Sequence, residues 1–287
     1  MRQRETVRMG KWNRQAKRLR RKKRVIHLVV IIVLFLVVKN SVNIVSRLSL
    51  GAGIFSGNNS SDDFSGDNSL SNFLGNNSSG YFSEGVYPDS LIELAKKNPE
   101  AEQFVKDYPD KKDDNGKIDV SSDLTEGIPL FLQWDERWGY RQYGGDFMAV
   151  NGCGPTCLAM VWCGLNSDGK WNPYKVASMA EEEGYYVPGQ GTSWDLMTNG
   201  AAELGLHAES VTFDETHILD TLQRGKPIIC VMGPGDFTTQ GHFLVLTGVD
   251  SAGKIQLNDP NSKKRSGQGW ELSRLMSQIR NLWAYTV

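Results

Sequence analysis

Of the four cysteines in the chain, Cys153 has the surroundings that most favour catalysis. It lies in the run Asn-Gly-Cys-Gly-Pro, residues 151–155, where a predicted helix begins. The unpaired N–H groups and partial positive charge at a helix N-terminus lower the pKa of a thiol. The resulting thiolate is a nucleophile at neutral pH, and small flanking residues leave room for a substrate backbone. This pattern favours attack by Cys153 on a carbonyl carbon.

The other thiols are Cys157, Cys163 and Cys230. Three of the four cysteines fall within eleven residues on one predicted helix, a spacing that suits neither an ordinary disulfide nor a zinc site. We therefore expect most of the thiols to be free, and a free cysteine is normally a small core residue. The sequence implies no metal and no organic cofactor.

A nucleophilic thiol needs a base, and His242 is the best placed of four histidines. His27 falls in an apolar run near the N-terminus, and we expect His207 and His217 at the surface. His242 instead begins the strongest predicted strand, residues 242–249. Its simpler interpretation is a hydrogen-bonded histidine at a strand end.

A third group must hold the imidazole in the correct tautomer. The strand that begins at His242 is joined to a second predicted strand, residues 254–257, by a tight turn. An antiparallel hairpin folded there places His242 within about two rungs of Asp259. A shift of one residue would present Asn258 instead. The hairpin therefore predicts one of these two side chains beside His242, and we favour Asp259.

Acyl transfer also requires hydrogen-bond donors for the developing oxyanion. The backbone N–H of Cys153 is one candidate, and a side-chain amide is the usual second donor. Gln133 ends a short extended segment before the helix and is our candidate for that amide. Its alternative interpretation is an exposed amide at a strand end.

Four segments together resemble the papain-like cysteine peptidases, and the bacteriocin-processing-like family 39 in particular. These segments are Gln133-Trp134-Asp135, Gly152-Cys153-Gly154-Pro155-Thr156, Gly241-His242-Phe243 and Asn258-Asp259-Pro260. The resemblance covers residues 128–287. It implies Cys153 as nucleophile, His242 as base, Asp259 as orienting residue and Gln133 as oxyanion donor. It also implies a helical lobe that faces an antiparallel β lobe. Papain itself has Asn at the third position, so Asp259 departs from that pattern.

The predicted elements agree with a mixed domain. Apolar spacing and capping residues predict helices over 153–165, 172–184, 193–204, 214–224 and 270–279. Short branched and apolar runs predict strands over 227–232, 242–249, 254–257 and 282–287. Helices first and strands afterwards indicate an α+β fold with two lobes. A helical extension, residues 87–127, precedes this domain.

Charge is distributed very unevenly along the 287 residues. Residues 1–24 carry 12 Lys or Arg and one Glu, whereas the remaining 263 residues sum to −12. An apolar run over 25–38 follows and continues less cleanly to residue 45, which is long enough to cross a bilayer. Basic flanks stay cytoplasmic. We predict a cytoplasmic tail over 1–24, a membrane anchor over 25–45 and a Gly/Asn/Ser-rich flexible spacer over 46–86.

A cleaved signal peptide is the alternative to a retained anchor, and both place the domain outside the cytoplasm. The basic tail is more economically explained as a topology signal than as a nucleic-acid site, so no nucleic-acid partner is expected. The 39% hydrophobic content and 8 Trp exclude collagen, a disulfide-dense mini-protein and a fully disordered chain.

These features together predict a membrane-anchored, extracytoplasmic cysteine peptidase that acts on a peptide or protein. Two other classes stay open. The same residues could transfer the acyl group to an amine, or the domain could be an inactive binding module at the cell surface.

Overall fold

The computed structural model describes residues 85–287, and the predicted tail, membrane anchor and all but two residues of the spacer lie outside these described residues. Within the described part, no helix has the length and apolar character needed to cross a bilayer.

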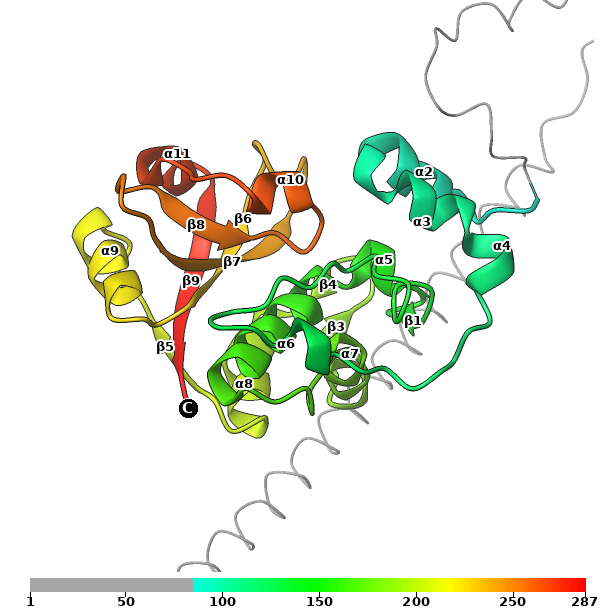
Figure 1. Cartoon of the computed structure of the whole chain (residues 1–287), viewed down its shortest axis with the longest axis horizontal. Helices are drawn as coiled ribbons and strands as arrows, with labels where there is room; N and C mark the ends of the chain where they lie inside the picture. Colours follow the sequence, from blue (N-terminus) through cyan, green and yellow to red (C-terminus); the bar gives the residue numbers. More distant parts are fainter. Residues whose placement is uncertain (1–84) are drawn as a thin grey trace, which may run out of the picture. The chain divides into compact units, whose positions relative to one another are not determined.

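A five-stranded antiparallel sheet forms one side of the domain (Figure 1). Its strand order is β5 (His207–Ser210), β9 (Ile279–Thr286), β6 (Ile228–Met232), β7 (His242–Val249) and β8 (Ile255–Asn258). All five residues of β6 are buried, which explains why this strand is apolar on both faces. The strand that begins at His242 is therefore held between β6 and β8 in the sheet.

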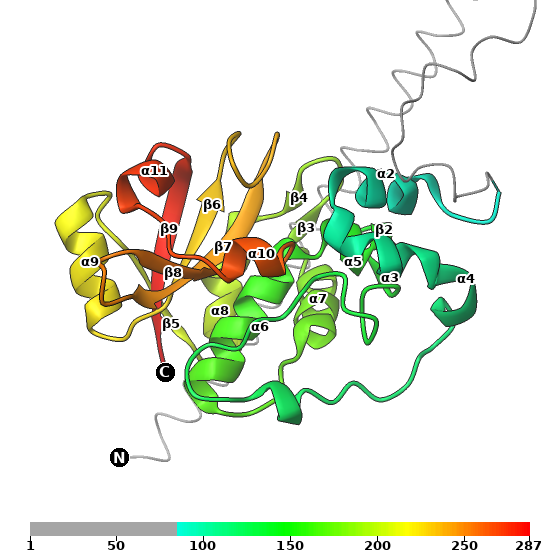
Figure 2. The ribbon, with the colours of Figure 1, turned by 45° about the horizontal axis from the view of Figure 1, so that its top comes forward.

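Helices α6 (Cys153–Asn166) and α8 (Asn199–Glu203) pack against one face of this sheet. Helices α5 (Met148–Asn151) and α7 (Pro173–Glu182) contact α6 in turn. Residues 154–163 of α6 are all buried, because α6 lies between the other helices and the sheet (Figures 1 and 2). Ile229, Val231, Phe243 and Val245 of the sheet belong to this same core. The central helix and the central strands therefore pack directly on each other.

The opposite face of the sheet packs against α9 (Glu215–Gln223) and α11 (Leu272–Met276). Strand residues that alternate with those of the first core, such as Cys230 and Leu244, point into this second core. The sheet is thus buried on both sides, and its register is strongly specified.

The N-terminal segment forms α2 (Asp89–Lys97), a 3-10 turn (Pro99–Ala101), α3 (Glu102–Lys106) and α4 (Tyr108–Lys111). Asn98 ends α2, and its side chain accepts a hydrogen bond from the N–H of Glu100 to begin the next turn. These helices pack in a third apolar cluster with Leu132, Trp134, Tyr140, Phe147 and Ala149.

The mixed α+β fold with an antiparallel sheet is confirmed, but some predicted elements differ. The helix expected over 193–204 is interrupted at Thr198, which separates a 3-10 turn (Trp194–Met197) from α8. The last strand begins at Ile279 instead of residue 282, because it spans the sheet between β5 and β6. The predicted order of helices before strands is wrong for β5, which precedes α9.

Smaller elements were not predicted. They are the hairpin β1 (Gln142–Tyr143) and β2 (Asp146–Phe147), the hairpin β3 (Tyr186–Val187) and β4 (Gly191–Thr192), and α10 (Lys263–Ser266).

Candidate active site

Cys153 is the first residue of α6, and Gly152 alone separates it from the short helix α5. The glycines on each side are required by packing. A Cβ on Gly152 would lie 2.4 Å from the carbonyl oxygen of Met148, and a Cβ on Gly154 would lie 2.9 Å from a methyl carbon of Thr192. The space beside these glycines is therefore filled by the protein itself, so the expectation that they leave room for a substrate backbone is wrong. Cys153 is partly exposed, whereas the other three cysteines are buried, and all four thiols are free as expected.

His242 and Asp259 are in direct contact. Nε2 of His242 lies 2.7 Å from Oδ1 of Asp259, whose side chain is fully buried. The second carboxylate oxygen of Asp259 accepts a hydrogen bond from Nε of Arg265 at 2.6 Å. A backbone N–H, that of Asn261, also donates to Oδ1 at 2.8 Å. The carboxylate is therefore held in one orientation toward the imidazole.

The hairpin of β7 and β8 explains this contact. Val245 pairs with Asn258, and the register shifts by one residue at a bulge between Leu246 and Gly248. Asn258 turns away and donates from Nδ2 to the carbonyl oxygens of Ile128 and Pro129. Asp259, and not Asn258, consequently faces His242.

Electrostatic interactions link Cys153 to this pair. Burial opposes ionisation of Cys153, but hydrogen bonding to His242, the positive charge of His242 and two backbone N–H groups outweigh it and lower the thiol pKa. Burial disfavours the charged form of His242, yet Asp259 and Cys153 together raise its pKa to about 10. Burial also disfavours the charged form of Asp259 and raises its pKa, but His242 and Arg265 outweigh this and bring the pKa below its usual value. The arrangement therefore stabilises a thiolate beside an imidazolium.

Gln133 lies close to this group but does not line the adjoining cavity. Its side chain is buried, and its Nε2 donates to the carbonyl oxygens of Ala149 at 2.6 Å and Val150 at 3.3 Å. Its backbone N–H donates to the carbonyl of Pro260 at 2.7 Å. In this state the Gln133 amide is bound to the segment that precedes Cys153.

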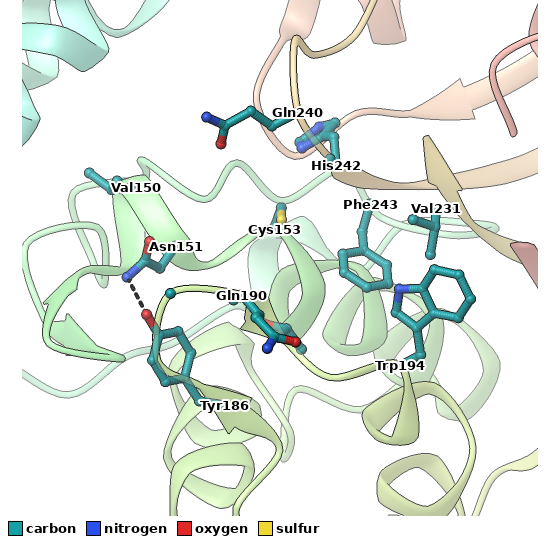
Figure 3. Close-up of a pocket in the computed structure, with 14 residues that line it drawn as sticks. Val150, Asn151, Cys153, Tyr186, Gln190, Trp194, Val231, Gln240, His242 and Phe243 are labelled. Atoms are coloured by element: carbon teal, nitrogen blue, oxygen red, sulfur yellow. Dashed lines mark hydrogen bonds between the residues drawn. The ribbon is translucent and has the colours of Figure 1, made fainter. Parts of the chain in front are cut away.

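A cavity of about 590 Å³ opens beside Cys153 and His242 (Figure 3). Apolar side chains of Trp194, Val231 and Phe243 gather on one side of it, whereas Asn151 and Tyr186 lie on the other. None of the side chains that line it is an Asp, Glu, Lys or Arg. The lining residues are Val150, Asn151, Cys153, Tyr186, Gly189, Gln190, Gly191, Thr192, Trp194, Val231, Gln240, Gly241, His242 and Phe243.

Two groups of residues near the site differ in their contacts. The Gly-rich loop before His242 contributes Gln240 and Gly241 to the cavity. The aromatic residues after Gln133 instead serve packing: Trp138 donates to the carbonyl of Leu132 inside the core, and Tyr140 donates to that of Phe104.

Sequence reasoning missed the β3–β4 hairpin and Arg265. The hairpin places Tyr186 and Gln190 at the cavity. Gly189 lies in its turn and Gly191 begins β4, and both have positive φ. Two glycines so close together, between aromatic residues, are the signal that could have indicated a tight hairpin. No comparable signal points to Arg265.

The comparisons with known proteins agree with the fold. A family model described as a Peptidase_C39 like family matches residues 125–287. No curated protein matches the chain.

Proposed function

Because the chain belongs to the C39-like peptidase family, we propose that it is a thiol hydrolase that cleaves peptide bonds through Cys153, His242 and Asp259. The observation that carries this proposal is geometric: Cys153, at the start of α6, lines one cavity with His242, and Nε2 of His242 lies 2.7 Å from the buried carboxylate of Asp259. The lowered pKa of the Cys153 thiol agrees with this arrangement. A thiol of this kind is the nucleophile that cysteine peptidases require.

In the proposed reaction, the Cys153 thiolate attacks the carbonyl carbon of the scissile bond and forms a tetrahedral oxyanion. His242, already protonated, gives its proton to the leaving nitrogen, and the C–N bond breaks to leave a thioester on Cys153. Neutral His242 then takes a proton from water as the water attacks the thioester. The acid is released, and the thiolate and imidazolium are restored.

Asp259 would keep His242 in the required orientation and stabilise its positive charge. The oxyanion would accept a hydrogen bond from the backbone N–H of Cys153 and one from the amide of Gln133. For Gln133 this role requires its Nε2 to exchange at least one bond to Ala149 or Val150 for the oxyanion.

The cavity supports a peptide or protein substrate with uncharged residues near the cleaved bond. Apart from the Cys153–His242 pair, whose charges neutralise each other, the cavity wall offers a charged side chain no opposite charge to replace the water that it would lose. A large apolar residue of the substrate could pack against Trp194, Val231 and Phe243 on one side of the cavity.

We also propose that the peptidase domain acts outside the cytoplasm while residues 25–45 anchor it to the membrane. The basic residues of 1–24, followed by the apolar run, support this orientation. The domain boundaries at residues 24, 45, 86 and 127 belong to the same proposal.

Alkylation of the native full-length chain with iodoacetamide, followed by mass spectrometry, tests the nucleophile. Cys153 should react much faster than the buried Cys230, whose pKa is raised by burial. Labelling of Cys153 no faster than Cys230 would overturn the proposal.

A peptide library then tests the reaction. Cys153→Ala should abolish cleavage, whereas Cys163→Ala, a change of the same kind ten residues further along α6, should not. An added amine separates the alternatives, because acyl transfer would produce an amine adduct and hydrolysis a free acid.

A further inference from the structure

The turn that carries Asp259 is held by residues far away in the sequence. Within the turn, the N–H of Ser262 donates to the carbonyl of Asp259, and the N–H of Asp259 donates to the hydroxyl of Ser266. These local bonds shape residues 259–266, but Asp259 keeps its distance to His242 only if the whole turn stays in place. The outer side of the turn therefore matters to the site.

The N-terminal helical segment contacts that outer side. Asn98 donates from Nδ2 to the carbonyl oxygen of Asn261 at 2.7 Å and to its Oδ1 at 2.9 Å. Glu100 accepts a short hydrogen bond from the Ser262 hydroxyl, and its other oxygen accepts from the N–H of Lys264 at 3.1 Å. Figures 1 and 2 show α10, which follows this turn, directed toward the helices of the segment.

Each of the contacts between side chains has one partner that is shielded from water, whereas the other partners, Asn261 and Glu100, are partly exposed. Asn98 is 8% exposed and Ser262 is 2% exposed. Asn98 also caps the 3-10 turn through its own Oδ1, which accepts from Glu100 at 3.1 Å. Buried polar atoms of this kind cost free energy if their partners are lost, so the contact is a specific one.

The segment itself is attached firmly. The rings of Phe104 and Tyr140 stack with centroids 4.1 Å apart, and the Tyr140 hydroxyl donates to the carbonyl of Phe104 at 2.6 Å. A Cβ on Gly139 would lie 2.6 Å from the Phe104 ring, which requires glycine at this contact. Because the segment is fixed to the domain in this way, its contacts with the turn restrict the position of the turn.

We propose that Asn98 and Glu100 are positioning residues that keep the turn 259–262, and with it Asp259, aligned on His242. This inference rests on the proposed function. The family model matches from residue 125 onward, so both residues lie outside the part of the chain that it covers. In this proposal the helical segment supports the geometry of the active site through its contacts with the turn.

The test uses the full-length chain with Asn98→Ala and Glu100→Ala, singly and together. Glu102→Ala is the matched control, since this glutamate pairs with Lys106 instead of the turn. In each protein, the rate of Cys153 alkylation by iodoacetamide is measured from pH 4 to pH 10, and kcat and KM are measured on a cleaved peptide.

We expect kcat to fall about 10-fold in the double variant with little change in KM, because small misplacements of catalytic groups are costly. A looser Asp259 stabilises the imidazolium less, so the midpoint of Cys153 alkylation should move to higher pH. Glu100→Gln keeps an acceptor for Ser262 and should recover part of the activity. The control should behave like the wild type.

A merely structural role would give a different result. Lower thermal stability with an unmoved alkylation midpoint and unchanged kcat per folded molecule would overturn the inference. If Glu100→Ala fails to fold, Ser262→Ala removes the hydroxyl that Glu100 binds, together with the N-cap of α10, and should move the midpoint in the same direction. If Asn98→Ala fails to fold, Asn261→Ala removes one of the two bonds that Asn98 makes and should also move the midpoint in that direction. The pH profile of Cys153 alkylation in the wild type distinguishes failure of this inference from failure of the proposed function. A wild-type midpoint equal to that of an ordinary thiol would refute the proposed peptidase, whatever the variants show.

Discussion

Nε2 of His242 and Oδ1 of Asp259 lie 2.7 Å apart, at a point where neither side chain is more than 7% exposed. Because Asp259 contacts Nε2, the other ring nitrogen of His242 is available to Cys153, and the interaction of Cys153 with His242 lowers the pKa of the thiol and raises that of the imidazole. The order Asp259, His242, Cys153 is the basis of the predictions that follow.

The first prediction concerns pH. The reactive form has Cys153 as thiolate and His242 protonated, so it exists above the lowered pKa of Cys153 and below the raised pKa of His242, about 10. The midpoint of Cys153 alkylation should therefore lie at a lower pH than that of an ordinary thiol, which ionises near about 8.5. Peptide cleavage should decline again as the pH approaches 10. An alkylation curve that rises only above pH 8 would contradict this assignment.

Replacing Asp259 should narrow that pH range. In Asp259→Asn the imidazolium loses its negative partner, so the pKa of His242 falls and the pKa of Cys153 rises. We expect kcat to fall by a factor on the order of 10² to 10⁴. Asn258→Ala is the neighbouring control: it loses bonds to Ile128 and Pro129, at a cost of about 1 kcal/mol in stability, but leaves both pKa values in place. Equal kinetic effects of the two variants would rule out the special role of Asp259.

Arg265 should matter mainly for stability. Arg265→Ala leaves the buried oxygen Oδ2 of Asp259 without its charged partner, so unfolding in urea should be easier by about 1 to 3 kcal/mol. Lys264→Ala also removes one positive charge but no side-chain bond to Asp259, and should change stability by no more than about 0.5 kcal/mol. Two indistinguishable unfolding curves would show that the Arg265 contact contributes nothing.

The role of Gln133 is tested by comparing two measurements: kcat for peptide cleavage and the ionisation of Cys153. If its amide stabilises the oxyanion, Gln133→Ala should lower kcat on the order of 10²-fold to 10³-fold. The pH profile of Cys153 alkylation should stay the same, since that reaction forms no oxyanion. Thermal unfolding measures the separate effect of losing the bonds to Ala149 and Val150. Unchanged kcat in a folded variant would remove Gln133 from the mechanism.

Trp194 is expected to affect substrate choice. It is 47% exposed at the cavity and packs edge-on against Trp283. Trp194→Ala should raise KM about 10-fold for peptides with a large apolar residue near the cleaved bond, and have little effect on peptides with small residues there. Phe213, which is 55% exposed and does not line the cavity, provides the control variant Phe213→Ala. A uniform change across all peptides would argue against a binding role.

Local patterns predicted the parts of the site that depend on neighbours in the sequence. The apolar spacing of α6 and the strand beginning at His242 are properties of short segments, and the tight turn after β7 brings Asp259 near His242. The choice between Asp259 and Asn258 needed the actual register, including the bulge after Leu246.

The rest of the site depends on contacts between distant residues. His207 pairs with Thr286 between strands, and Glu100 accepts a hydrogen bond from Ser262. The sequence around His207 and Glu100 does not predict these partners. Arg265 looks like one of three consecutive cations until the fold places it on Asp259.

The position of β9 between β5 and β6 limits the order in which the strands of the sheet can pair. A chain made from its N-terminus has β5, β6 and β7 available early, but β5 can pair only after residues 283–286 have been added. Until then the sheet is incomplete, and β6 presents an unpaired edge on the side that β9 later covers. Cys153 and His242 are therefore both synthesised before the strand that completes the sheet.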